Sequence, residues 1–407
     1  MKALRIVWGM GLAALAMSMA RADDDVVVNA GKDGFSLQSR GGAFLIKLRG
    51  GIQADSRWFL SDRAKLNTDT FVGRRVRPII EGTVHERYDF RVMFDLVDGR
   101  STLLDAYLDV RPTDALKLRF GKYKPPVGLE RLQSFPDVRF VERAYPTNLA
   151  PNRDYGLMLH GEPLKGAVTY GVGLFNGAPD GGNLDADVSD AKDLVARAFV
   201  QPWKNDANSK WNGIGLGVAG THGDQAGALP SYKSAGQATV FSFVTGATAD
   251  DERTRIYPQL YAYSGSLGLI AEYVQGKQTA KKDGKKTEFK TTGAEVAATY
   301  LLTGEKASYK SITPNSPFNF YGGKGAIELA ARFQTFDVEA KAFEKGVADP
   351  TKSVRRADTW TGGVNWYLNR NARFTVNYEL TEFRRGAANS ANRPTERVIE
   401  SRYQLAW

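Results

Sequence analysis

The sequence predicts an all-β protein, a transmembrane antiparallel β-barrel of about sixteen strands. The clearest observation is the stretch Phe90-Arg91-Val92-Met93-Phe94-Asp95-Leu96. Successive side chains of a strand point to opposite faces, so one face here is hydrocarbon while the other carries a cation and an anion. This alternation recurs along almost the whole chain, and beyond the N-terminus no apolar run is long enough for a membrane-spanning helix. The pattern is typical of a closed barrel with lipid outside and water inside.

The N-terminus has the features of a cleavable export signal. Met1-Lys2-Ala3-Leu4-Arg5 is basic, Ile6 to Ala16 is mostly apolar, and Ala20-Arg21-Ala22 fits a small-x-small cleavage site. The alternative, a membrane anchor, requires a longer apolar run. We therefore expect a signal peptide at 1–22, a short periplasmic segment at 23–43 and a single barrel domain at 44–407.

The composition narrows the compartment and the chemistry. The chain has no cysteine, which excludes thiol nucleophiles, disulfides and thiolate metal sites. Export without disulfides suits the envelope of a Gram-negative bacterium, and the strands place the protein in its outer membrane. The net charge of +10 raises nucleic acid as a partner, but an exported chain with no DNA- or RNA-binding motif argues against it.

Sixteen segments alternate clearly enough to predict as strands. They lie at about 44–59, 71–84, 90–97, 104–110, 116–120, 154–162, 166–175, 193–203, 211–221, 254–263, 266–275, 289–302, 324–336, 357–368, 372–383 and 397–407. Pro78 interrupts the second segment and predicts a bulge, because proline removes a donor from the ladder. The last segment ends in the aromatic residue Trp407, as expected of a strand recognised by the outer-membrane assembly machinery.

The connections predict two different rims. With the N-terminus in the periplasm, long connections at 123–152, 176–192, 222–253, 276–288 and 337–356 fall on the extracellular side. One long segment, 303–323, falls on the periplasmic side. Residues 239–244 could form an extra strand, but an odd strand count would separate the two termini. We therefore assign them to a loop.

Cations gather on the predicted inner face of the first five strands. They are Lys47, Arg49, Arg57, Arg75, Arg77, Arg91, Lys117 and Arg119. A cationic, water-filled channel concentrates anions, and the guanidinium fork suits phosphate. The alternative is that the acids of the same face (Asp55, Glu81, Asp95, Asp105 and Asp109) neutralise these cations and leave a general or sugar-type porin.

The loop after the fifth strand is the expected constriction. Lys124, Arg131, Arg139 and Arg143 lie in it, and Pro125-Pro126 stiffens its entry. Folded into the lumen, the loop would add these cations to the channel. Folded outward, it would present them to solvent.

An enzyme is not predicted. His85, His160 and His222 lack the spacing of a metal site or a catalytic triad, and no carboxylate pair sits in a recognisable acid–base motif. No cofactor is expected. An outer-membrane enzyme or adhesin is the alternative from another functional class.

The sequence resembles the phosphate-selective porin O and P family over nearly all of its length after the signal. Lys47-Leu48-Arg49-Gly50-Gly51-Ile52-Gln53-Ala54-Asp55 and Gly121-Lys122-Tyr123-Lys124-Pro125-Pro126 carry the resemblance, together with 73–77, 105–108, 141–144, 300–306, 325–332 and 365–369. It implies a sixteen-stranded barrel, a homotrimer and anion conduction along an arginine ladder. It also implies that 123–152, 222–253 and 303–323 narrow the lumen.

These observations together predict an outer-membrane channel for passive diffusion of phosphate, pyrophosphate or polyphosphate. The expected partners are inorganic anions, outer-membrane lipid, two further copies of the chain and the assembly machinery. The residues expected to bind anions or line the pore are Lys47, Arg49, Arg57, Arg75, Arg77, Arg91, Lys124, Arg131 and Arg143.

Overall fold

The computed structural model describes residues 26–31, 34–60, 66–187 and 189–407, and it confirms the predicted sixteen-strand antiparallel barrel. The predicted signal peptide at 1–22 lies outside the described residues. The barrel strands are β3 (Leu45–Phe59), β4 (Thr70–Val84), β5 (Tyr88–Asp95), β6 (Thr102–Thr113), β7 (Leu116–Tyr123), β8 (Asp154–Gly161), β9 (Val168–Phe175), β10 (Asp193–Val200), β11 (Ile214–Ala228), β14 (Thr248–Ser264), β15 (Leu267–Lys282), β16 (Lys285–Leu301), β17 (Ala326–Val338), β18 (Val354–Tyr367), β19 (Ala372–Arg385) and β20 (Glu396–Ala406).

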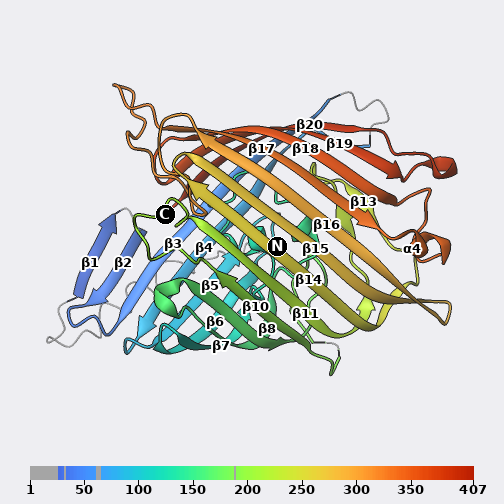
Figure 1. The fold of residues 1–407 in the computed structure, drawn as a ribbon, viewed down its shortest axis with the longest axis horizontal. Coiled ribbons are helices and arrows are strands. Elements are labelled where there is room, and N and C mark those ends of the chain that lie inside the picture. The colour runs from blue at the N-terminus through green and yellow to red at the C-terminus, as the bar shows by residue number, and fades with distance from the viewer. Residues whose placement is uncertain (1–25, 32–33, 61–65, 188) are drawn as a thin grey trace, which may run out of the picture.

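The barrel closes where its last strand meets its first (Figure 1). β20 pairs with β3 from Val398↔Phe59 to Ala406↔Gly51. Inside this seam the directly opposed residues bond to each other: Asp55 accepts two hydrogen bonds from Arg402 at 2.7 Å each, and Arg57 Nε donates to Glu400 at 3.0 Å. Every barrel strand therefore has two neighbours, and none presents an open edge.

The two faces of the strands are inverted relative to a soluble sheet. On β19, the inward residues Thr375, Asn377 and Glu379 are fully buried, whereas Tyr378 between them is 42% exposed on the outside. Water-soluble sheets bury the apolar side instead. The outer surface is thus the apolar one, as the alternation predicts.

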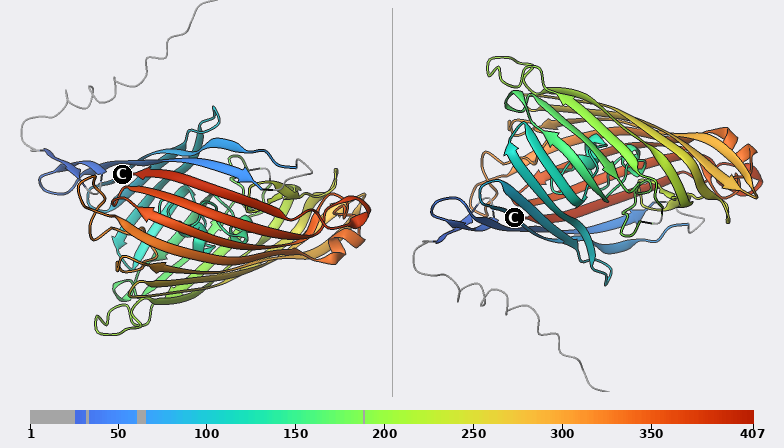
Figure 2. Two further views of the ribbon diagram at one scale, coloured as in Figure 1. Left: turned by 90° about the horizontal axis from the view of Figure 1, so that it is seen from above. Right: turned by 90° about the horizontal axis from the view of Figure 1, so that it is seen from below.

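A hairpin precedes the barrel, and the sequence reasoning did not anticipate it. β1 (Val26–Gly31) and β2 (Gly34–Ser39) pair with each other, and β2 continues onto β3 from Phe35↔Leu48 to Gln38↔Leu45. These pairs occupy the part of β3 that β20 does not reach. The hairpin therefore extends beyond the rim of the barrel, next to the C-terminus (Figures 1 and 2).

The two rims differ as predicted, with two exceptions. The rim beside the C-terminus, here called the short-turn rim, has turns at 85–87, 114–115, 162–167, 265–266 and 368–371, the connection 201–213, which is longer than the predicted turn there, and the long segment 302–325. The predicted long loop at 276–288 is wrong: β15 and β16 continue to a two-residue turn at Asp283 and Gly284, with φ of 50° and 77°. Two positive φ values define a type I′ hairpin turn, for which Asp-Gly is a signal. The ends of β15 and β16 at this turn extend beyond the bilayer and need no apolar face. Apolar and polar residues therefore alternate only weakly there.

The bulge predicted at Pro78 lies elsewhere. Pro78 pairs in regular register with Gly50, and the ladder between β4 and β5 ends one residue away at Ile79↔Met93. The missing N–H of Pro78 therefore removes no hydrogen bond from the β4–β5 ladder. The bulge occurs four residues earlier, at Arg74, because the pairing shifts between Gln53↔Arg75 and Ala54↔Gly73.

Three connections fold into the lumen rather than away from it. The inner loop (residues 124–153) contains the short helices α2 (Leu129–Leu132) and α3 (Tyr145–Asn148) and is almost entirely buried. The connection between β11 and β14 contains β12 (Tyr232–Lys233) and β13 (Thr239–Phe241), which pair with each other and not with the barrel. This confirms the assignment of 239–244 to a loop.

The third inward connection is the segment 302–325 on the short-turn rim, which contacts the inner loop. The remaining short elements are α4 (Ala340–Glu344), η1 (Leu164–Gly166) and η2 (Ala388–Ser390). In the part of the chain that the structure describes, no helix has the length and apolarity to cross a membrane.

The largest hydrophobic cluster lies inside the barrel. Tyr145 and Leu149 of the inner loop pack with Tyr232 and Phe241 of the β11–β14 connection and with Phe336 of β17. These side chains fill the lumen on the β15–β18 side. These contacts pack the inner loop against that side of the lumen.

Candidate functional site

A cavity of about 600 Å³ lies between the inner loop and the inner face of β3–β7. Lys310, Ser311 and Thr313 of the segment 302–325 and the turn residues Arg370 and Asn371 border it, so it faces the short-turn rim. The three inward connections leave this space on one side of the lumen. It is the part of the lumen in which a solute meets the predicted cations.

Eight cationic side chains line this cavity. They are Arg49, Arg77, Arg91, Arg119, Lys124, Arg153, Lys310 and Arg370. Two acidic side chains, Asp105 and Asp137, line it with them. We call it the cation-lined cavity.

Carboxylates pair with most of the arginines of the wall, as the alternative interpretation anticipated. Arg77 donates to Asp95 at 2.7 Å and Arg119 to Asp109 at 2.6 Å. Arg49 and Arg91 share Glu81, while Asp105 lies between Arg91 and Arg153. These partners and Asp137 make five acids against eight cations, so the cavity keeps an excess of positive charge.

Four of the predicted pore residues line the cavity: Arg49, Arg77, Arg91 and Lys124. Lys124 lies at the start of the inner loop, and its ammonium donates to the carbonyl oxygens of Arg131 at 2.6 Å and Gln133 at 2.8 Å. Burial, together with the positive charges of Arg153 and Arg143, lowers the pKa of Lys124 well below its usual range. Its charge is therefore the most sensitive to alkaline pH among the cations of the loop.

Arg57 and Arg75 lie instead in a buried cluster around Glu142 of the inner loop. Arg57 donates to Glu142 at 2.9 Å, and Arg74 of the bulge donates to the same carboxylate from Nε at 2.5 Å. Arg75 donates to Gln53 at 2.6 Å and lies 3.8 Å from Glu142. Neither Arg57 nor Arg75 lines the cavity, so this ion network fastens the inner loop to β3 and β4.

The remaining predicted residues do not line the cavity either. Arg131 donates to the carbonyl oxygens of Thr147 and Ala150, and Arg143 donates to those of Glu130 and Gln133. Both arginines thus bond the inner loop to itself. Lys47 is half-buried near the start of β3, opposite Glu81 and on the rim side of the cavity.

Lys310 and Arg370 line the cavity but were not among the predicted pore residues. Both come from connections, where no two-residue period reveals which side chains point inward. Arg153, at the end of the inner loop, became a lining residue only because the loop folds inward. No local signal in the sequence distinguishes these residues from surface cations.

The inner loop is held across the lumen by polar side chains of the far wall. Glu272 accepts the backbone N–H of Leu129 at 2.7 Å, and Asn377 accepts that of Val141 at 2.7 Å. On the near wall, Gly51 of β3 allows close approach of the loop: a Cβ there would lie 2.6 Å from the ring of Phe135. The side chain of Phe135 therefore occupies space that only glycine leaves free.

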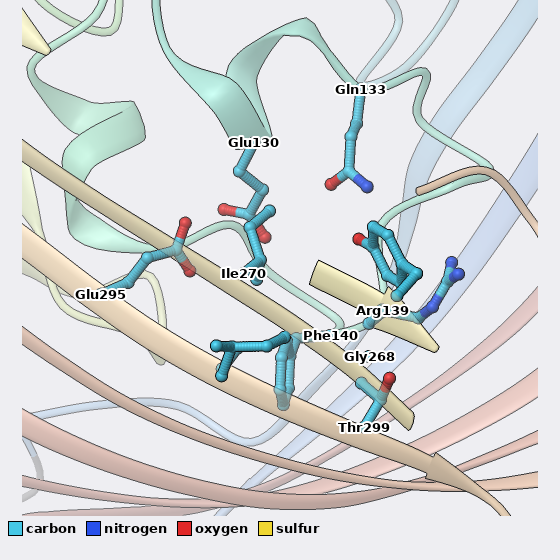
Figure 3. Close-up of a pocket in the computed structure, with 11 residues that line it drawn as sticks. Glu130, Gln133, Arg139, Phe140, Gly268, Ile270, Glu295 and Thr299 are labelled. Carbon is cyan, nitrogen blue, oxygen red and sulfur yellow. The ribbon is translucent and has the colours of Figure 1, made fainter. Parts of the chain in front are cut away.

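A second, much smaller cavity lies between the inner loop and β15–β16. It measures about 20 Å³, and the side chains of Glu130, Ile270, Glu295 and Phe140 surround it (Figure 3). The described residues contain no group of three or more His, Asp or Glu side chains arranged to hold a metal ion. His160 Nε2 lies 2.9 Å from Asp109 Oδ1, a carboxylate that also accepts a hydrogen bond from Arg119.

A closed sixteen-strand barrel with a charged lumen and an inward loop defines an outer-membrane porin, located in the outer membrane of a Gram-negative bacterium. A family model described as "Phosphate-selective porin O and P" matches residues 46–407, and the chain belongs to this family. Porin O of Pseudomonas aeruginosa is 23% identical over 390 residues, which cover 87% of this chain and 86% of the relative.

Solved structures share the fold. The outer membrane channel DcaP of Acinetobacter baumannii has a TM-score of 0.57 at 10% identity, with coverage of 91% of this chain and 99% of DcaP. The anion-selective porin from Comamonas acidovorans has a TM-score of 0.54 at 13% identity, with coverage of 89% and 100%. At such identities the likeness shows the barrel fold alone.

Proposed function

We propose that this porin is a channel for passive diffusion of anions, with phosphate, pyrophosphate or polyphosphate as its preferred solutes. The observation that supports the proposal is the cation-lined cavity, in which eight basic side chains face five acids. Positive charge in a narrow aqueous space with low-dielectric walls raises the local concentration of anions. The description of the family names phosphate, a member of this solute class.

The predicted residues act at two distances in this proposal. Arg49, Arg77, Arg91 and Lys124 contact the anion, and Lys47 attracts it at the short-turn rim, which we take to be periplasmic. Arg57, Arg75, Arg131 and Arg143 add to the field from behind the surface of the cavity. Paired arginines exchange a carboxylate for the passing anion, so the anion is bound without being trapped.

Single-channel recording in planar bilayers tests the proposal. In a salt gradient the reversal potential is expected to show anion preference, and phosphate is expected to block the chloride current. Arg77→Ala and Arg91→Ala are each expected to weaken that block roughly two- to tenfold, since each removes one charge from the cavity. Cation preference of the wild-type channel contradicts the proposal.

Arg111→Ala is the matched control. Arg111 is an arginine of β6 paired with a carboxylate, Asp89 at 3.0 Å, but it does not line the cavity. The same loss of charge at the rim is expected to leave the phosphate block unchanged. An equal effect of Arg111→Ala and Arg77→Ala would contradict a local role of the cavity.

A general or sugar-type porin is the second candidate, and the paired carboxylates favour it. If Glu81, Asp95, Asp105 and Asp109 neutralise the arginines, the reversal potential lies near zero and neutral sugars pass as readily as anions of similar size. The same gradient experiment separates the two candidates.

We further propose that the channel is a homotrimer in the outer membrane, inserted by the assembly machinery through β20 and Trp407. OmpT of Vibrio cholerae, a structure of the same fold, is described in a trimer form. Mobility of the unheated protein in detergent gels, compared with its mass by light scattering, gives the oligomeric state.

A further inference from the structure

The cation-lined cavity is larger and more apolar than an inorganic anion needs. Its volume of about 600 Å³ is within the range of roughly 300–1,000 Å³ found for small-molecule sites. Hydrated phosphate is attracted by charge and gains nothing from hydrocarbon walls. The lining nevertheless includes Ile79, Met93, Tyr107, Leu132 and Phe135.

These apolar side chains form two groups on the wall of the cavity. Ile79 and Met93 are register partners on β4 and β5, and Phe135 of the inner loop packs on them. Tyr107 and Tyr123 meet edge to face, with ring centroids 5.8 Å apart. The apolar part of the lining therefore lies on neighbouring strands of one wall, and half-buried Leu132 of the inner loop also lines the cavity.

Cations lie beside this surface on the same strands. Arg77 is two residues from Ile79 on β4, and Arg91 is two residues from Met93 on β5, so each pair shares the inner face. The guanidinium of Arg119 lies 4.1 Å from the ring centroid of Tyr107, and that of Arg77 lies 5.3 Å from that of Phe135. A solute in the cavity therefore meets charge and hydrocarbon together.

We propose that the cavity selects organic oxyanions with an apolar body, that is, a carboxylate or phosphate monoester attached to a ring or a short alkyl chain. This inference rests on the proposed anion channel and names the solute class that its binding site prefers. The oxyanion head group meets the guanidinium groups of Arg77 and Arg91, which can bind it with two hydrogen bonds. The apolar body leaves water and contacts Phe135, Leu132 and Tyr107.

Blockade of the chloride current by matched phosphates tests this selectivity in the full-length channel. Phenyl phosphate, inorganic phosphate and a sugar phosphate of about the same size as phenyl phosphate are titrated separately. Phenyl phosphate is expected to block at a roughly tenfold lower concentration than inorganic phosphate, because burying part of the ring adds binding free energy. The sugar phosphate has the size but not the apolar body, and is expected to block no better than inorganic phosphate.

Two lining variants and one control locate the effect. Phe135→Ala and Leu132→Ala are each expected to reduce the ratio of the two half-blocking concentrations to about threefold or less. Phe140→Ala removes an aromatic ring from the same loop, but Phe140 does not line this cavity. Its ratio is expected to equal that of the wild type.

The outcomes separate this inference from the function on which it rests. If the wild-type channel is anion-selective but phenyl phosphate and inorganic phosphate block it equally, the apolar selectivity is overturned. The proposed anion channel is not contradicted by that result. Equal block by phenyl phosphate and the sugar phosphate also overturns the apolar selectivity, because size then explains the preference. Cation preference in the salt gradient overturns the anion channel itself. The wild-type comparison needs no variant and is decisive by itself.

Discussion

The arginines of the wall are individually bonded to carboxylates, and this pairing limits how strongly any one of them can bind a solute. Asp95 illustrates it: its carboxylate accepts two hydrogen bonds from Arg77 and the backbone N–H of Val76 at 3.2 Å. An anion that reaches Arg77 must compete with a carboxylate that is already in place. The cost of displacement lowers affinity, which favours release and hence throughput.

Lys124 differs from the arginines because its charge can be removed by pH. Its pKa is lowered, so raising the pH removes this proton first, while guanidinium groups stay charged. Anion selectivity is therefore expected to decrease as the pH is raised. The decrease is expected to begin below about pH 10, where ordinary lysines are still charged. Reversal potentials recorded between neutral and alkaline pH measure this fall.

Lys124→Arg provides the control, because arginine keeps its charge over the same range. Selectivity of this variant is expected to stay constant across the titration. A parallel decline in wild type and variant would assign the effect to another group.

At the scale of elements, a single carboxylate makes the ionic attachment of the inner loop to β3 and β4. Glu142 accepts hydrogen bonds from Arg57 and Arg74, while Arg75 and Arg402 lie 3.8 Å and 3.9 Å away. Four guanidinium groups, three of them buried, thus share one loop residue.

Glu142→Gln is expected to loosen the loop and destabilise the barrel. The variant removes the charge of the carboxylate that these guanidinium groups share, and breaking a buried ion pair costs about 3–5 kcal/mol of unfolding free energy. Urea unfolding of the refolded protein measures that loss, and increased fluctuation of the open-channel current reports loop motion.

Glu288→Gln is the matched substitution on an exposed pair. Glu288 lies 2.7 Å from Lys277, and both side chains are about half exposed. Neither stability nor current noise is expected to change. A Glu142→Gln channel with the current noise and the unfolding free energy of the wild type would contradict the anchoring role of Glu142.

The sequence predicted strands far better than connections, and the reason is physical. Alternation is imposed on β4–β7 by lipid on one side, so the inward positions of Arg77 and Arg91 follow from parity alone. No comparable constraint acts on the inner loop, where Arg131 and Arg143 bond backbone carbonyls instead of lining the cavity. Lys310 and Arg370 reach the cavity through tertiary folding that no local pattern encodes. Arg57 has the predicted parity, but its partner Glu400 belongs to the other end of the chain.

At the scale of the whole molecule, the barrel is closed by the pairing of its first strand, β3, with its last strand, β20. Gln53 and Gln404, 351 residues apart, bond across the seam, as do Asp55 and Arg402. Each ladder elsewhere joins strands that are neighbours in the sequence. The seam is the one barrel contact in the described chain that requires the first and last strands together.

Deleting residues 396–407 is expected to prevent barrel formation, because β3 and β19 would both be left with unpaired backbone groups that lipid cannot satisfy. Detergent gels of unheated samples distinguish a compact folded barrel from an unfolded chain. Deleting residues 26–39 removes a hairpin that pairs with only four residues of β3, and this variant is expected to fold. A folded barrel without β20 would contradict the role of the seam.

The absence of a side chain at Gly51 has a consequence for flow through the channel that does not involve charge. A methyl group there would displace the ring of Phe135 toward the opposite wall, because the backbone of β20 closes the other direction: Leu405 O would lie 2.9 Å from the same carbon. The aperture would narrow while all eight cations stayed in place. Two related channels could thus differ in permeation rate through a single substitution such as Gly51→Ala. A comparison of their charged residues would not reveal this difference.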